Sequence, residues 1–163
     1  MGGPSFVSDT DRGRRAGTYG EMCDFLRLVQ CFDILHAGGA SPFEPLDLPA
    51  ESRHLDKCYA AITCHDKVWS ASMLGGFRAR DAMEMLCIVH GIDYGELPEH
   101  VVGLGNINTN SPRQLDESMS DALTVLAEAG QPVVVTPFTL LGAMAPTTIA
   151  GALTQQNLSL IHI

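Results

Sequence analysis

Basic residues are scarce in this sequence, and most of them are scattered. The 163 residues include 10 Lys and Arg against 19 Asp and Glu, which gives a formal net charge of −9. A nucleic-acid-binding protein needs a basic face, and the one local cluster consists of Arg12, Arg14 and Arg15. We therefore expect no nucleic-acid partner.

Long apolar runs are missing as well. No run approaches the roughly 20 residues that span a bilayer. The first residues, Met1-Gly-Gly-Pro-Ser, have neither the charged nor the apolar region of a signal peptide. These features predict a cytoplasmic protein without a membrane partner.

The spacings that mark metal and nucleotide sites do not occur. The five cysteines form no C-x-x-C pair, and Cys64 and His65 are adjacent, so they cannot easily ligate one ion together. No G-x-G-x-x-G follows the first expected strand, and there is no G-x-S-x-G elbow. We expect no metal site. We also expect reduced thiols, with Cys23, Cys31 and Cys87 buried at helical positions.

What the sequence does contain is an alternation of strand-like and helix-like segments. Apolar residues make up 45% and charged residues 18%, a composition typical of a folded globular chain. Strands are expected at 5–8, 34–37, 68–73, 101–107 and 133–135, and helices at 22–32, 49–63, 78–90, 115–129 and 146–157.

Short apolar strands of this kind are typical of a parallel sheet that is covered on both faces. Repeated strand–helix units fit either a doubly wound sheet or a (β/α)8 barrel, and the missing nucleotide fingerprint weakens the first. Eight barrel units usually take about 250 residues. We therefore predict an α/β fold, a partial (β/α)8 TIM barrel of about five βα units.

Local signals place several helix ends. Thr18 and Glu21 have the spacing of a capping box, and Gly91 and Gly130 stand where left-handed C-caps are expected.

The last six residues, Leu158-Ser-Leu-Ile-His-Ile163, differ in composition from the small and polar residues of the expected helix before them. Their back-translation, CTG TCT CTT ATA CAC ATC, matches a transposon-end adapter used in preparing sequencing libraries. We expect residues 158–163 to be a non-native, adapter-derived tail, the alternative being a short apolar strand.

Four stretches together carry a resemblance to a known family. They are Gly2-Gly-Pro…Phe6-Val-Ser-Asp-Thr-Asp-Arg-Gly-Arg-Arg15, Pro49-x-Glu-Ser-Arg-His-Leu-Asp56, Asn108-Thr-Asn-Ser-Pro-x-x-Leu-Asp116 and Thr136-Pro-Phe-Thr-Leu-x-Gly-Ala-Met-Ala-Pro146. In this order they resemble the trimethylamine methyltransferase (MttB-like) family, and the resemblance extends over residues 2–157.

The resemblance implies a (β/α)8 barrel that moves a methyl group from a methylated amine, or from a quaternary amine such as a betaine, to the cobalt of a corrinoid carried by a partner protein. One branch of the family uses pyrrolysine, at a position that would lie beyond Asn157. Family members are much longer than this chain. The resemblance therefore implies that residues 1–157 are an internal, partial methyltransferase domain that is inactive by itself, and that the full-length protein is a homo-oligomer.

A barrel builds its active site from the loops after its strands. Because aromatic faces and carboxylates hold methylated cations, we expect substrate contacts from Phe138 after the fifth strand and from His36 and Glu44 after the second. Alternatively, His36 is a satisfied core histidine and Glu44 is solvated. Asp9 and Asp11, next to Arg12, either face a ligand or form a loop clasp.

The loop Asn106–Pro112, at the end of the fourth strand, offers Asn108, Asn110 and Ser111, whose amides and hydroxyl can hydrogen-bond a substrate carboxylate or the corrinoid edge. The alternative is a loop that caps the following helix. Ser70 and Ser72 share one face of the third strand, as polar lining or as small-residue packing.

Thr136 and Thr139 flank Phe138 and complete the expected substrate-binding set. Gly142 and Met144 permit the close approach of a large flat ring, so we expect them to face the corrinoid. Tight packing of small residues is the alternative.

Two other functions stay open: an unrelated TIM-barrel aldolase or lyase, and a non-catalytic binding domain. An aldolase needs a Schiff-base lysine at the end of a strand. Lys57 is expected in the middle of a helix and Lys67 before its strand, which counts against the aldolase.

Overall fold

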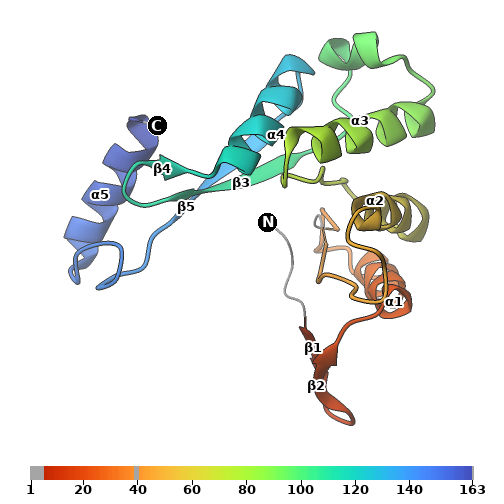
Figure 1. Cartoon of the computed structure of the whole chain (residues 1–163), viewed down its shortest axis with the longest axis horizontal. Coiled ribbons are helices and arrows are strands. Elements are labelled where there is room, and N and C mark those ends of the chain that lie inside the picture. The colour runs from red at the N-terminus through yellow and green to blue at the C-terminus, as the bar shows by residue number, and fades with distance from the viewer. Residues whose placement is uncertain (1–5, 39–40, 163) are drawn as a thin grey trace.

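The structure is a computed structural model, and it describes residues 6–38 and 41–162. Ser5 of the first expected strand and Ile163 of the expected tail lie outside these ranges. The helices follow one another in chain order, with α1 packed on α2, α2 on α3 and α3 on α4 (Figure 1). Among the described helices, none combines the length and apolar character that crossing a bilayer requires.

The described residues begin with a hairpin. Strand β1 (Phe6–Asp9) pairs antiparallel with β2 (Gly13–Ala16). The Asp9 side chain accepts the backbone N–H groups of Asp11 at 3.1 Å and Arg12 at 2.6 Å, and such an Asx turn reverses the chain. The strand expected at 5–8 is therefore present as β1, but it pairs antiparallel in a hairpin, so its expected place in a parallel sheet is wrong.

The helices confirm most of the expected units and shift several of their ends. Thr18 and Glu21 form the capping box of α1, and Gly91 ends α3 at a φ of 66°. The first turn expected from Pro49 is not part of α2, which begins at Arg53. The bounds are α1 Tyr19–Gln30, α2 Arg53–Cys64, α3 Gly76–His90, the 3-10 helix η1 Tyr94–Glu99, α4 Glu117–Glu128 and α5 Ile149–Ile161.

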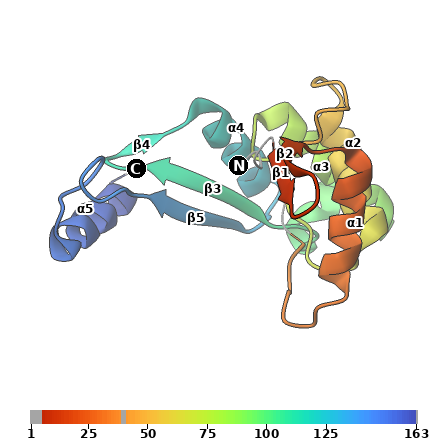
Figure 2. The ribbon, with the colours of Figure 1, turned by 90° about the horizontal axis from the view of Figure 1, so that it is seen from below.

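One parallel pair forms the main sheet. Strand β3 (Gly105–Asn110) runs parallel to β5 (Val133–Phe138), and the short β4 (Gln114–Leu115) pairs antiparallel with the end of β3. Figure 2 shows the two long strands side by side, with α5 beyond their carboxyl ends.

Two expected strands are reduced to single bridges. The bridge between Ala37 and Val68 and the bridge between Ser70 and Leu104 are both parallel. Ile34, in the segment expected as the second strand, is 81% exposed, so little apolar packing holds it extended. The segments around 37, 68–70, 104–110 and 133–138 are nevertheless parallel neighbours in chain order. A (β/α)8 barrel has this order, and so does part of a doubly wound sheet, so the TIM barrel stays a prediction.

The main core lies between the sheet and two helices. Ile107 of β3 packs against Leu126 of α4, and Met83 and Leu86 of α3 complete the same buried cluster. A second cluster joins α1, α2 and the proline-containing loop (residues 41–49) through Met22, Leu26 and Phe43, among others. Burying these side chains contributes most of the stability of such a layered fold.

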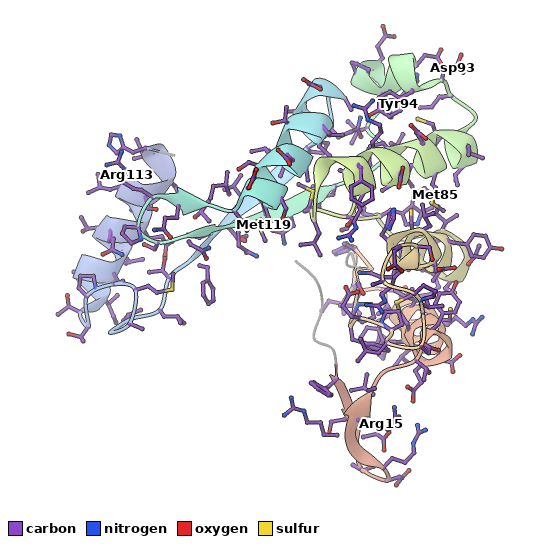
Figure 3. The ribbon with its side chains drawn as sticks, in the orientation of Figure 1. Arg15, Met85, Asp93, Tyr94, Arg113 and Met119 are labelled. Atoms are coloured by element: carbon purple, nitrogen blue, oxygen red, sulfur yellow. The ribbon has the colours of Figure 1, made fainter. Side chains whose placement is uncertain are left out.

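The last helix extends beyond its expected end. Helix α5 continues to Ile161, so the residues expected as a tail are helical at least that far, and the alternative of a terminal strand is wrong. The hydroxyl of Ser159 is buried and accepts the backbone N–H of Arg113 at 2.7 Å. Figure 3 shows Arg113 beside α5. Whether residues 158–163 come from an adapter stays a prediction.

Candidate functional site

The two faces of β3 differ in chemistry. Side chains alternate along a strand, so Ile107 and Thr109 are buried on one face while Asn106, Asn108 and Asn110 lie on the other. Asn106 begins the loop that was expected to contribute to the site, although the expected substrate-binding set takes only Asn108, Asn110 and Ser111 from that loop. The spacing of two between Asn106 and Asn108 is the signal that would have included Asn106.

Strand β5 adds two side chains to this row. The register places Thr136 next to Asn108 and Phe138 next to Asn110. We call the five residues Asn106, Asn108, Asn110, Thr136 and Phe138 the amide face. Four of the eight expected substrate-binding residues therefore lie together on the amide face.

The Thr136 hydroxyl is fixed by several acceptors. Its one hydrogen is shared between the backbone oxygen of Ile107, at 3.0 Å, and the side-chain oxygen of Asn108. This contact orients the Asn108 amide, whose NH2 group stays available to a ligand. The Phe138 ring is 46% exposed, so an aromatic surface stands open at the carboxyl end of β5.

Ser111 and Thr139 lie off the amide face. The buried Ser111 hydroxyl accepts from the Gln155 side chain of α5 at 2.8 Å, which makes Ser111 an anchor between the loop after β3 and that helix. The hydroxyl of Thr139 is buried and finds no hydrogen-bond partner among the described residues.

The expected corrinoid-facing residues lie in a tight turn after β5. Gly142 has a φ of 79° and donates its N–H to the oxygen of Ala145 at 2.8 Å. The side-chain amide of Gln155 on α5 donates to the backbone oxygen of Met144 at 2.6 Å. Helix α5 therefore holds the turn in place. Gly142 itself is exposed, and its surface is open to a ligand.

Glu44 and His36 occupy a different part of the molecule. The Glu44 carboxylate forms an ion pair with Lys57 and lies 4.0 Å from a guanidinium nitrogen of Arg53, so two cations of α2 already match its charge. The His36 ring is exposed, and its backbone oxygen accepts the N–H of Val68 at 3.1 Å. Neither residue is part of the amide face.

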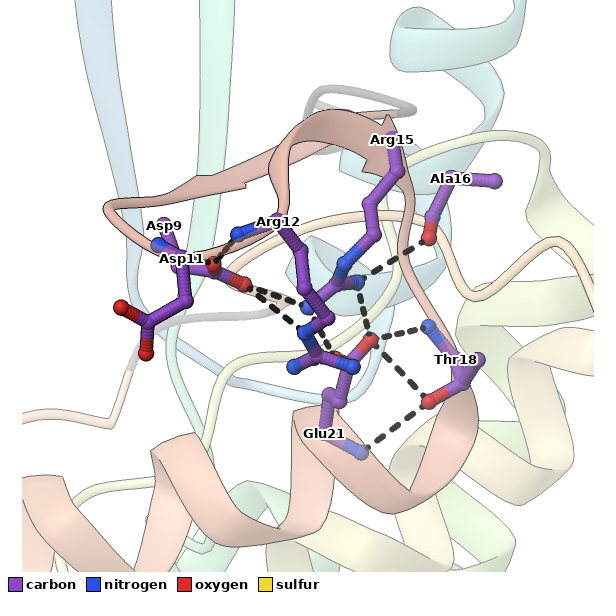
Figure 4. Close-up of polar contacts among 7 residues, drawn as sticks. All are labelled: Asp9, Asp11, Arg12, Arg15, Ala16, Thr18 and Glu21. Atoms are coloured by element: carbon purple, nitrogen blue, oxygen red, sulfur yellow. Dashed lines mark hydrogen bonds and ion pairs between the residues drawn. The ribbon is translucent and has the colours of Figure 1, made fainter.

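The acidic residues of the first hairpin form a clasp (Figure 4). Arg15 bridges Asp9 at 2.7 Å and Glu21 at 2.8 Å, and Arg12 reaches Glu21 at 3.1 Å. The hydrogen bond from Arg15 lowers the pKa of Glu21 to about 2. Of the two readings of Asp9, the loop clasp is therefore the one that the structure supports.

Two groups of sequence expectations concern metals and thiols. Over 6–38 and 41–162, no three His, Cys, Asp or Glu side chains come close enough to hold a metal ion. All five cysteines are free. Cys23 and Cys87 are buried as expected, but Cys31 is exposed because α1 ends one residue before it.

Comparison with known proteins decides the family. The profile of the family described as trimethylamine methyltransferase (MTTB) matches residues 1–159. The chain belongs to the trimethylamine methyltransferase family. The resemblance carried by the four sequence motifs is thereby confirmed. The family match ends two residues inside the expected tail.

One relative shows how much of a related methyltransferase this chain covers. The chain is 34% identical over 155 residues to a glycine betaine methyltransferase of Desulfitobacterium hafniense (strain Y51). The alignment takes in 95% of this chain and 32% of the relative, so this member of the trimethylamine methyltransferase family spans about a third of that protein's length.

Proposed function

We propose that the whole protein is a methyltransferase that takes a methyl group from a small methylated amine, and that betaine-like quaternary amines are its first candidate substrates. The observation that carries this proposal is family membership over residues 1–159. The glycine betaine methyltransferase related to the chain supports the choice of substrate class.

The amide face supplies side chains that suit such a substrate. The exposed ring of Phe138 offers a π surface, and π surfaces attract quaternary ammonium groups. Asn108, oriented by Thr136, can hydrogen-bond a polar group on the same substrate. In-line transfer of a methyl group depends mainly on positioning, so this proposal requires no protein nucleophile.

The acceptor in the proposal is a corrinoid held by a partner protein, whose cobalt receives the methyl group. The edge of a corrin ring carries amide groups, and the exposed Asn106 and Asn110 present matching amides. A methyl group added at Gly142 would meet only Thr147, at 3.5 Å, so the turn leaves room for a flat ring. The chemistry of these residues suits a corrinoid. We assign Asn106, Asn110, Gly142 and Met144 to the part of the site that would contact it.

We propose further that the 163-residue chain alone is inactive. It spans 32% of the related methyltransferase, and a cation at Phe138 would stay in contact with water because that ring is 46% exposed. A cytoplasmic location and a homo-oligomeric state stay predictions from the sequence.

An aldolase gains no support from the structure. Lys57 lies inside α2 and is ion-paired with Glu44, so it is not a free amine at the end of a strand. A non-catalytic binding protein would take up a betaine without removing its methyl group, and the assay below separates that function from methyl transfer.

The test is the formation of methylcobalamin from Co(I) cobalamin by the whole protein, with glycine betaine and a panel of methylated amines. We expect methyl transfer from at least one of them, and a marked loss of it in Phe138→Ala. Phe25→Ala is the matched control, since Phe25 is similarly exposed but lies on α1. If no compound in the panel yields methylcobalamin, the proposal fails.

A further inference from the structure

We propose that a pocket between the proline-containing loop, the start of α2 and the start of α3 binds an oxyanion, either a carboxylate or a phosphate group. The pocket has a volume of about 230 Å³. The lining residues that carry the argument are Glu44, Arg53, His54, Lys57, Ser72 and Arg78. This inference does not depend on methyl transfer.

The pocket gathers positive charge. The chain has 10 Lys and Arg and a net charge of −9, yet Arg53, Lys57 and Arg78 all line this one pocket, with Glu44 as its single carboxylate. Only 18% of the Arg53 side chain and 13% of the Lys57 side chain are exposed. Because water screens such buried charges poorly, their attraction for an anion is stronger than at the surface.

Residues that line the pocket also have buried nitrogen atoms without hydrogen-bond partners among the described residues. The Nε atoms of Arg53 and Arg78 and the Nδ1 atom of His54 are buried without a hydrogen-bond partner in the described residues. Buried donors are nearly always paired in folded proteins, so the two unpaired Nε–H groups, on two arginines of one pocket, indicate an absent acceptor. Nδ1 of His54 does not count as a donor, because the ring hydrogen lies on Nε2, which faces Asp81. The His54 side chain is 9% exposed and its Nε2 bonds Asp81 at 2.7 Å.

The cationic groups are also held in place. A terminal nitrogen of Arg53 donates to the oxygen of Leu48 at 2.6 Å, and one of Arg78 donates to the oxygen of Leu74 at 3.2 Å. Side chains that are fixed before binding lose less conformational entropy when the ligand arrives. Glu44, which pairs with Lys57, competes with an incoming anion.

The pocket lies on the carboxyl side of the parallel strand positions. Ser72 and Leu74 follow the parallel bridge at Ser70, so the pocket lies on the carboxyl side of that strand position. Asn110 and Phe138 mark the same end of β3 and β5. A carboxylate of a small zwitterion and a phosphate of a larger ligand both meet the chemistry, and the experiment distinguishes them.

The experiment is calorimetric titration of the whole protein with inorganic phosphate, acetate, glycine betaine and choline. We expect saturable binding of at least one of the first three. In Arg53→Gln and Arg78→Gln, Kd should rise roughly ten- to hundredfold, the range expected when one hydrogen bond to a charged group is lost. In Arg27→Gln, an exposed arginine of α1, Kd should stay at the wild-type value.

Glu44→Gln provides a test that misfolding cannot mimic, because removing the competing carboxylate should tighten anion binding. Binding of glycine betaine but not choline supports a substrate carboxylate as the source, and binding of phosphate alone supports a phosphorylated ligand. If the wild-type protein binds none of the anions, or if Arg53→Gln and Arg78→Gln bind them as the wild type does, the proposal is overturned.

Discussion

The side-chain oxygen of Gln131 accepts the backbone N–H of Val102 at 2.9 Å, in a site where Gln131 is 4% exposed. The two N–H groups of the same side chain are shared among three backbone oxygens, those of Leu97 at 3.0 Å, His100 at 2.8 Å and Ala129 at 3.0 Å. Gln131 thus ties the end of η1 and the segment leading into β3 to the end of α4.

Replacing Gln131 with Met should destabilise the protein by at least about 3 kcal/mol, because several buried backbone groups lose their partners and each unpaired group costs about 1–3 kcal/mol. Urea denaturation measures the change in the free energy of unfolding. Gln114→Met, at an exposed position of β4, should change it by less than about 0.5 kcal/mol. Equal denaturation midpoints for the two variants would contradict this role of Gln131.

Gly38→Ala should also be destabilising. The added Cβ would lie 2.1 Å from Nε2 of His65, and the buried ring would have to move, at a cost of about 1–3 kcal/mol. At Gly20 in α1 an added Cβ meets nothing within 4 Å, so Gly20→Ala should be neutral or stabilising by up to about 1 kcal/mol. Thermal unfolding of both variants tests the comparison, and a neutral Gly38→Ala would be the contrary result.

The hairpin clasp should make stability depend on acid pH. The hydrogen bond from Arg15 lowers the pKa of Glu21 from 4.5 to about 2 in the folded protein. Glu21 therefore contributes stability above pH 4.5, and this contribution is lost as the pH falls toward 2. We expect Glu21→Gln to flatten the pH dependence of Tm in that window. Asp24→Asn, at an exposed ion pair of α1, should leave it unchanged. A Glu21→Gln curve parallel to the wild type would argue against the clasp.

On the amide face, Thr136→Val should lower activity without unfolding the protein. Valine keeps the shape of threonine but loses the hydroxyl that holds the Asn108 amide. Loss of one such hydrogen bond, worth about 1 kcal/mol, should reduce kcat/KM for the methylated amine roughly fivefold. Thr124→Val on α4, where the hydroxyl bonds Ser120 on an exposed surface, is the matched control. Equal kcat/KM values for the two variants would contradict the role of Thr136 in positioning Asn108.

Local sequence signals predicted local structure well. The capping box at Thr18 and Glu21 and the cap at Gly91 depend on residues within one turn of helix, and the structure has both. The period of two along β3 would likewise have placed Asn106 on the face of Asn108.

Features that depend on distant residues escaped the sequence. The hairpin at Asp9 was missed although it is local, because its second strand contains Arg14 and Arg15 and lacks the apolar alternation typical of a strand. The pocket around Glu44 and Arg78 brings together separate elements of the chain. No spacing rule relates such residues, since tertiary packing alone sets their distance.

Strand β5 has a consequence for the exchange of amide hydrogens with solvent. β3 pairs with β4 and β5, whereas β5 pairs in the described sheet with β3 alone. Alternate amides of β5 should therefore exchange with deuterium far sooner than those of β3. If another strand docks beside β5, in the whole protein or in an assembly, the fast amides between Val133 and Phe138 should become slow, and the exchange rate would report that docking residue by residue.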